Sequence, residues 1–518
     1  IFSFSFGAAA LCAALLPLDG TLWLLGALAL AAALLTGLPH GSKQARLAVR
    51  WGAMGLAAGV LWTAGYTALF WRPAQALDDR TVRLSGTVAE WPQEREYGWS
   101  VLVRMETEGP AVPTLLFADS QAAQLRPGDR VETVAHCTLA DRSRAGEEIT
   151  YYTAKGIFLR AEAYGELRVT RPERLPLRYL PAELAHQLKQ GVDAAFPEDA
   201  APLIRALTTG NRDNLTDHYT SSLQRTGLSH TVAVSGMHLS FLAALVSGLL
   251  GRGKRRSALV TCGVVLVFTL ISGCTPSVVR AAVMLILLQL AALLGRERDP
   301  LTALALALML LLAWNPFSAA HIGLQLSFAS VVGILLFSDR LQERMLRGWK
   351  RPPKDSIPLR LLGALVRFGA AALSATLGAM VFTTPLTALY FGSLSLISPL
   401  ANLMTLWAVS AAFSGGLIAG AAGAVLPELG RVLALPVLPF VRYLDWVVPR
   451  LARAPFAWSK AMPALCPIVL AGFWYLYRQT LLPRFWYQHQ QELYLAVWTM
   501  AGVLALLPCL KRRHWGML

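Results

Sequence analysis

Several stretches of this chain are apolar over lengths that match the thickness of a lipid bilayer. A helix of about 20 apolar residues crosses the hydrocarbon core. Residues 51–71 and 493–510 are the clearest examples, since neither shows the polar face of a soluble core helix. Further apolar segments lie at 22–38, 259–272 and 278–294. These segments predict a polytopic α-helical membrane protein.

The composition agrees with this prediction. Charged residues make up 15% of the 518 residues and hydrophobic residues 55%, whereas about 25% of a soluble globular protein is charged. The mean hydropathy is +0.47. The net charge of +16 would suggest a nucleic-acid partner in a soluble protein. In a membrane protein, the enrichment of cytoplasmic loops in Lys and Arg is the better explanation.

Residues 78–176 have a different pattern. Apolar and polar residues alternate along 82–88 and 99–105, and this period of two is typical of β-strands. Three more short strands are expected at 114–118, 131–139 and 156–163. Five strands predict a small β-barrel, with an OB-fold as the first candidate. The stretch holds 13 Lys/Arg and 16 Asp/Glu, a net charge of −3. We therefore expect the barrel to guide a strand of DNA or dock a partner rather than grip DNA tightly.

Basic loops predict the orientation of the helices. Lys and Arg cluster at 43–50, 252–256, 296–298 and 339–360, and pairs of apolar segments fit between successive clusters from residue 252 on. The positive-inside rule places all of these loops on the cytoplasmic side. The β domain then lies outside. Residues 1–16 are interpreted as a retained membrane helix rather than a signal peptide.

The chain is thus divided into five segments. They are N-terminal transmembrane helices (1–76), an inserted extracellular OB-like β domain (78–176), amphipathic interfacial helices (177–227), a transmembrane core (228–482), and a last transmembrane helix with a basic C-terminus (483–518).

Polar residues enter an apolar segment at 227–239, where His230, Ser235, Gly236 and His238 occur together. Polar groups within the membrane are costly and usually mark a site or a pathway. Ser235 and Gly236 can also break or bend the helix there. The alternative is that these residues only hydrogen-bond between closely packed helices.

An intramembrane hydrolase is an alternative for the same residues. Ser235 and His238 are three residues apart and can touch on a helix, whereas His230 and Ser235 are about 140° apart on a regular one. No GxSxG motif and no nearby carboxylate supports a catalytic triad. Six scattered cysteines and nine histidines offer no zinc spacing. No catalytic residue, metal or cofactor is therefore predicted. A small-molecule transporter is the other alternative, although no inverted repeats are visible.

Two further motifs place polar groups at the start of apolar helices. Thr275 is a candidate N-cap with Pro276 at the first helical position, and Arg280 follows one turn later beyond Ser277. Helix N-termini and arginine both favour phosphate, but an arginine there could instead extend to the outer membrane interface. Gln325 and Ser327 enter another helix. Asn402 follows the proline-containing segments at 384–386 and 398–401. These last residues fit either helix packing or a cavity lining.

Taken together, the motifs closely resemble those of the ComEC family of competence proteins. The matching residues are 230–238, 275–280, 325–328 and 398–402, in that order. The membrane core of this family is held to be a channel for incoming DNA. The resemblance implies a channel that moves single-stranded DNA across the bacterial cytoplasmic (inner) membrane during natural transformation. It places the DNA pathway at His230, Ser235, Gly236, His238, Thr275, Ser277, Arg280, Gln325, Ser327 and Asn402.

The resemblance also implies the partners of such a channel, besides the DNA and membrane lipid. Many family members continue into a metallo-β-lactamase-like nuclease domain, and this chain has no HxHxDH motif. We therefore expect no enzyme activity here and a separate nuclease. No nucleotide-binding motif is present, so an ATP-driven cytoplasmic translocase is expected. A DNA receptor is expected outside.

Overall fold

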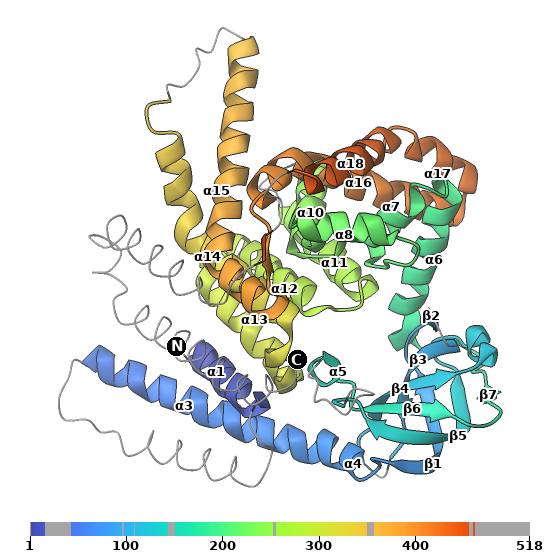
Figure 1. Ribbon diagram of the computed structural model, residues 1–518. Coiled ribbons are helices and arrows are strands. Elements are labelled where there is room, and N and C mark those ends of the chain that lie inside the picture. Colours follow the sequence, from blue (N-terminus) through green and yellow to red (C-terminus); the bar gives the residue numbers. More distant parts are fainter. Residues whose placement is uncertain are drawn as a thin grey trace. The chain divides into compact units, whose positions relative to one another are not determined.

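The computed structural model describes residues 2–15, 43–95, 98–107, 109–142, 151–251, 255–349, 357–454 and 459–460 (Figure 1). They form two compact units. The first holds the described residues of 1–183 and 305–324, and the second those of 184–304 and 325–480. The apolar segments at 22–38 and 493–510 lie outside the described residues.

Two apolar helices open the first unit. Helix α1 (Phe2–Leu15) packs along α3 (Lys43–Tyr66), which continues through η1 (Thr67–Trp71) into α4 (Arg72–Gln75). A Cβ on Gly59 would lie 2.6 Å from the carbonyl oxygen of Phe6, so glycine is what lets the two backbones approach. Residues 50–75 are long and apolar enough to cross a membrane, which confirms the helix predicted at 51–71.

A closed five-stranded barrel follows in the same unit. Its strands are β1 (Arg80–Val88), β3 (Gly98–Met105), β4 (Val112–Ala118), β5 (Arg130–Leu139) and β6 (Leu159–Ala163). They pair in the order β1-β3-β4-β6-β5, and β5 pairs with β1 to close the barrel. Only the β4–β6 pair is parallel among these. The small barrel predicted from the alternating pattern is confirmed. Two short strands, β2 (Gln93–Arg95) and β7 (Arg168–Thr170), extend its sheet.

The barrel core is made by the inward residues of each strand. Along β5, every second residue from Val131 to Leu139 is buried. Burial raises the pKa of the Cys137 thiol to about 11, so this cysteine acts as a small apolar packing residue.

A distant segment also fills this core. Phe317, in η4 (Pro316–Ala320), packs on Phe158 with ring centroids 6.1 Å apart. Asn315 Nδ2 donates to the carbonyl oxygens of Thr153 and Ala154 in α5 (Tyr151–Ala154). Residues more than 150 positions apart are thus joined in one core.

The second unit is helical. Its elements are α6 (Leu180–Ala195), α7 (Ala201–Thr209), α8 (Asp217–Arg225), α9 (Ser229–Val232), α10 (Gly236–Leu250), α11 (Arg255–Ile271), α12 (Pro276–Leu293), α14 (Ile322–Met345), α15 (Ile357–Phe391), α16 (Ser398–Val425), α17 (Pro427–Ala434) and α18 (Leu438–Ala452). The unit also contains two short strands, β8 (Ser393–Leu394) and β9 (Ser459–Lys460), which pair with each other in antiparallel orientation. Helix α13 (Pro300–Trp314) leads from the second unit into the first, and α14 leads back.

Five of the described helices are long and apolar enough to span a membrane: residues 50–75, 276–293, 322–345, 358–391 and 398–425. A sixth span would consist of α17 and α18, which meet at a bend of 55°. Helix α15 stays continuous through Pro385, so this proline does not interrupt it. The protein is therefore a multi-pass helical membrane protein with a small barrel, as predicted. Which side of the membrane the barrel occupies stays a prediction.

Helix α16 is the centre against which the amphipathic helices pack. A Cβ on Gly416 would lie 2.8 Å from Ile204 of α7, and one on Gly420 would lie 2.5 Å from Val192 of α6. Ile204 and Val192 are fully buried. Part of the apolar surface of α6 and α7 therefore faces protein, and the interfacial position of these helices stays a prediction.

Candidate functional site

The motif around Ser235 is a broken helix. Helix α9 ends at Val232, the chain is extended at Ala233 and Ser235, and α10 begins at Gly236. The break predicted at Ser235-Gly236 is thus confirmed. It leaves the first amide groups of α10 without partners in the helix.

His238 fastens the start of α10. Its side chain is fully buried, and its Nδ1 accepts a hydrogen bond from the backbone N–H of Ser235 at 3.1 Å. Its ring packs against Phe413 of α16, with centroids 4.8 Å apart. His238 therefore positions the helix start, while His230 is exposed and its Nδ1 lies 3.0 Å from the carbonyl oxygen of Gly227.

Ser235 and His238 touch but do not form a triad. The Ser235 hydroxyl oxygen lies 3.2 Å from His238 Nδ1, the atom that already accepts the backbone N–H of Ser235. His238 Nε2 is buried, and no group in the described part of the chain hydrogen-bonds to it. A catalytic imidazole needs a partner on its second nitrogen to orient it. Over the same residues, no three His, Cys, Asp or Glu side chains gather as a metal site would require.

Arg280 lies inside the helical unit. Thr275 is the N-cap of α12 with Pro276 after it, as predicted, although the Thr275 side chain makes no capping hydrogen bond. The side chain of Arg280 is buried, with 6% of the residue exposed. Its Nη1 donates to the carbonyl oxygen of Ser327 in α14 at 2.6 Å. The guanidinium of Arg280 is therefore held within the helical unit.

Three other predicted site residues join Arg280 here. The Ser327 hydroxyl donates to the Ser277 hydroxyl at 2.9 Å, which joins α12 and α14 beside Arg280. A Cβ on Gly236 would lie 3.0 Å from Arg280 Nη2, so the guanidinium reaches the start of α10. We call Gly236, Ser277, Arg280 and Ser327 the Arg280 cluster.

The charge of Arg280 is not neutralised by any carboxylate among the described residues. Arg205 shows the contrast. It is equally buried, with 7% of the residue exposed, but its Nη1 lies 3.1 Å from a carboxylate oxygen of Asp193. The ring of Phe328 lies near Arg280, with its centroid 5.8 Å from Cζ, and is a weak substitute for a counter-charge.

The cluster therefore has the chemistry of an anion site. An uncompensated buried charge costs several kcal/mol, and an incoming anion offsets that cost. The positive end of the α10 dipole adds to the attraction. Arginine offers planar, paired N–H donors that match a phosphate. Gly236 and Ser277 are partly exposed, so the cluster is not sealed.

The remaining candidates lie outside the Arg280 cluster. Gln325 accepts a hydrogen bond from the Tyr390 hydroxyl of α15, and Asn402 Nδ2 lies 3.5 Å from the Ser398 hydroxyl. A Cβ on Gly227 would lie 2.8 Å from Ser398, so the loop before α9 rests on the start of α16. Thr275 is exposed. Tyr390 was not among the predicted site residues, because only the fold brings it to Gln325.

Comparison with known proteins decides the family. Residues 207–484, more than half of the chain, match the family model described as Competence protein. The chain belongs to the ComEC family of competence proteins. The ComE operon protein 3 of Bacillus subtilis (strain 168) is 27% identical over 177 residues, which cover 34% of this chain. The match covers 23% of that relative's length. No solved structure matches the chain. The broken helix and the Arg280 cluster both lie within the matched range of this ComEC-family protein.

Proposed function

We propose that this ComEC-family protein carries single-stranded DNA across the bacterial cytoplasmic membrane during natural transformation. The observation that carries the proposal is Arg280 of α12, a buried cation with no carboxylate partner among the described residues. Its guanidinium group reaches the start of α10. DNA presents one phosphate per nucleotide to such a site. Membership of the competence family and the membrane-spanning helices support the same role.

A single unpaired arginine suits transport better than a strongly basic lining. Conduction needs contacts that attract the permeating species but release it again. The neighbours of Arg280 are the neutral side chains of Ser277 and Ser327 and the backbone at Gly236. Each phosphate would meet one charge and several neutral donors. His230 and Ser235 are exposed enough to line the approach, and His238 acts as a positioning residue.

The pathway proposal extends to the candidates outside the cluster. Thr275 lies at the exposed start of α12, and Gln325 and Asn402 are partly exposed on α14 and α16. These neutral side chains can line a path for a polyanion without trapping it.

The orientation is part of the proposal. The barrel at 78–176 lies outside, and the basic loops at 252–256 and 339–360 lie in the cytoplasm. Cysteine labelling in intact cells tests it, in a chain whose native cysteines are replaced. Ser120→Cys in the barrel should react with a membrane-impermeant maleimide, and Arg347→Cys should react only after the cells are opened. The opposite pattern would invert the topology.

The partners follow from what such a channel needs. We propose a DNA receptor outside, an ATP-driven translocase in the cytoplasm and a nuclease on another polypeptide or domain. The role assigned to the Arg280 cluster is binding and not catalysis. The barrel, with its net charge of −3, would guide the strand or dock a partner.

DNA import with Arg280 variants tests the function. Labelled DNA that reaches the cytoplasm is measured in cells with the variant as their only copy, next to the amount of protein in the membrane fraction. Arg280→Gln should lower import by about tenfold to hundredfold, the range of a charged hydrogen bond. Arg280→Lys should restore only part, since lysine lacks the paired donors. Arg225→Gln, at an exposed position of α8, is the control. Normal import by Arg280→Gln at a normal protein level would refute the proposal.

The contact between Ser235 and His238 keeps a hydrolase as the second candidate. A nucleophilic serine tolerates no substitution that removes its hydroxyl. Ser235→Ala should therefore abolish function if the protein is a hydrolase, but should reduce DNA import less than Arg280→Gln if it is a channel.

A further inference from the structure

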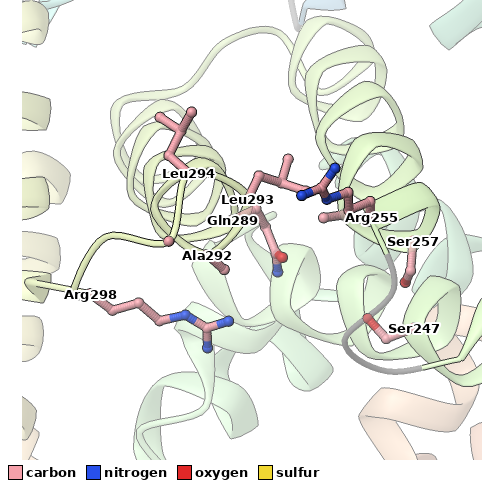
Figure 2. Close-up of a pocket in the computed structure, with 10 residues that line it drawn as sticks. Ser247, Arg255, Ser257, Gln289, Ala292, Leu293, Leu294 and Arg298 are labelled. Atoms are coloured by element: carbon pink, nitrogen blue, oxygen red, sulfur yellow. The ribbon is translucent and has the colours of Figure 1, made fainter.

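A second basic site lies at the other end of the helices that form the Arg280 cluster. A cavity of about 560 Å³ opens between the end of α10, the start of α11 and the end of α12. Its polar lining comes from all three helices and the residues after α12: Ser247, Arg255, Ser257, Gln289 and Arg298. In Figure 2 the Gln289 amide lies between the guanidinium groups of Arg255 and Arg298.

The cavity is positively charged and uncompensated. None of its ten lining residues is acidic, and within the described residues neither Arg255 nor Arg298 has a carboxylate within ion-pair distance. Ser257 is buried, with 3% of the residue exposed, and its hydroxyl belongs to the lining. Two guanidinium groups with neutral hydroxyl and amide donors between them match a phosphate group.

The position of the cavity distinguishes it from the Arg280 cluster. Helix α12 has 18 residues and is therefore about 27 Å long, close to the thickness of the hydrocarbon core. Arg280 lies near its first turn, and the cavity lies at its last turn. Because α12 is long and apolar enough to span the membrane, the cavity lies toward the opposite membrane surface from the Arg280 cluster, beside Arg256 and the basic residues at 296–298.

The rim of the cavity is apolar. Leu293 and Leu294 both belong to the lining, and Leu294 is 75% exposed. Exposed leucines at the end of a membrane helix face acyl chains. A ligand that combines a phosphate with hydrocarbon chains fits both parts of this surface, whereas a DNA strand offers nothing to the leucines.

We propose that this cavity binds the phosphate headgroup of an anionic phospholipid in the cytoplasmic leaflet. Basic pockets between helices on the cytoplasmic side are suited to such headgroups. The phosphate lies between Arg255 and Arg298 with Ser257 and Gln289 as further donors, and the acyl chains lie along Leu293 and Leu294. The choice of the cytoplasmic leaflet rests on the proposed orientation, whereas binding of the lipid does not depend on the proposed role in DNA import.

Lipid binding by the purified full-length protein tests the site. Protein in a neutral detergent is titrated with phosphatidylglycerol or phosphatidylcholine, and bound lipid is counted by native mass spectrometry. The double variant Arg255→Gln/Arg298→Gln should bind phosphatidylglycerol about tenfold more weakly, as loss of a charged hydrogen bond predicts. The matched control is Arg256→Gln/Arg296→Gln. It removes the same charge from neighbouring exposed arginines that do not line the cavity, and should change binding by less than about twofold.

Competition separates the lipid from other phosphates. Millimolar inorganic phosphate and a single-stranded oligonucleotide should both leave phosphatidylglycerol bound. Displacement by inorganic phosphate would mean a free-phosphate site, displacement by the oligonucleotide would mean a DNA contact, and either would overturn the lipid assignment. So would equal losses in the two double variants, or unchanged binding in the cavity variant. Thermal unfolding of each variant confirms that a loss of binding is not a loss of fold.

Discussion

Arg205 and Arg280 are buried to nearly the same degree in the helical unit, with 7% and 6% of each residue exposed. Arg205 is paired with Asp193 and also donates to the carbonyl oxygen of Asp213. Arg280 donates to a carbonyl oxygen as well, but the described residues give it no carboxylate. The first arginine thus holds α6, α7 and the loop after them together, and its charge is already neutralised. The charge of the second remains available to a ligand.

The barrel resembles the Arg205 region in this respect. Arg83 pairs with Glu132 at 3.0 Å, and Arg130 pairs with Glu106 at 2.7 Å. Arg171, which follows the last short strand, pairs with Asp129 at 3.3 Å. Basic residues are therefore not equivalent just because they are basic. What decides whether an arginine can attract a phosphate is whether a carboxylate has already neutralised it.

The largest effect should come from giving Arg280 a carboxylate of its own. Ser277→Asp places an acid three residues before Arg280 on α12, a spacing at which the two side chains pair. The new carboxylate would compete with each phosphate, and import should fall by about tenfold to hundredfold. Labelled DNA in the cytoplasm, relative to membrane protein, measures it.

Ser277→Asn is the control for that variant, because it has the same shape without the charge. It keeps a neutral hydrogen-bonding side chain at this position and should lower import much less than Ser277→Asp. If the asparagine variant fails as badly as the aspartate variant, the loss reflects the hydroxyl bond to Ser327 and not the charge.

Loss of Arg205 should lower the stability of the protein more than loss of Arg280. Arg205→Met leaves Asp193 without its partner, and we expect the free energy of unfolding to fall by about 1–2 kcal/mol, less than for a fully buried pair because Asp193 is partly exposed. Arg280→Met removes an unpaired buried charge, so stability should be unchanged or rise by about 1 kcal/mol. Thermal unfolding of the purified protein in detergent compares the two. Equal losses would show that Arg280 is neutralised in the protein after all.

A smaller effect is expected from crowding the guanidinium. A Cβ on Gly236 would lie 3.0 Å from Arg280 Nη2 and 2.9 Å from Ala281 Cβ, so Gly236→Ala should displace the side chain and lower import by about fivefold to tenfold. Gly248→Ala in the same helix is the control. A Cβ there meets no atom within 4 Å, and the change should leave import intact while it favours the helix by about 0.5–1 kcal/mol.

The sequence revealed most of what depends on local pattern. Alternation of apolar and polar residues predicted the strands of the barrel, because one face of each strand is buried. Segment length and apolarity predicted the candidate spans at 50–75 and 276–293. The way Phe317 and Asn315 enter the barrel could not be predicted, since no local pattern reports a contact across 150 residues.

The same limit applies to the site. Ser235-Gly236 predicted the helix break because serine and glycine favour one locally. The sequence also singled out Arg280, but a carboxylate partner is a matter of three-dimensional contact. Only the fold shows that Arg205 has one and that the partner of Arg280 is the Ser327 carbonyl. His238 was predicted to line a pathway, and the structure places it as a buried support for the start of α10.

The smallest effect on DNA import should come from substitutions in the barrel. They test whether arginines that are exposed but already paired with a carboxylate contribute to import. The side chains of Arg83 and Arg130 are 72% and 51% exposed, so an incoming strand could reach them if exposure were enough. Their charges are offset by Glu132 and Glu106, and exposed pairs of this kind contribute about 0–1 kcal/mol each. Arg83→Gln/Arg130→Gln should therefore lower DNA import by less than about twofold. A loss as large as that of Arg280→Gln would show that a paired arginine can still recruit DNA. The barrel and not the Arg280 cluster would then be the main contact for the strand.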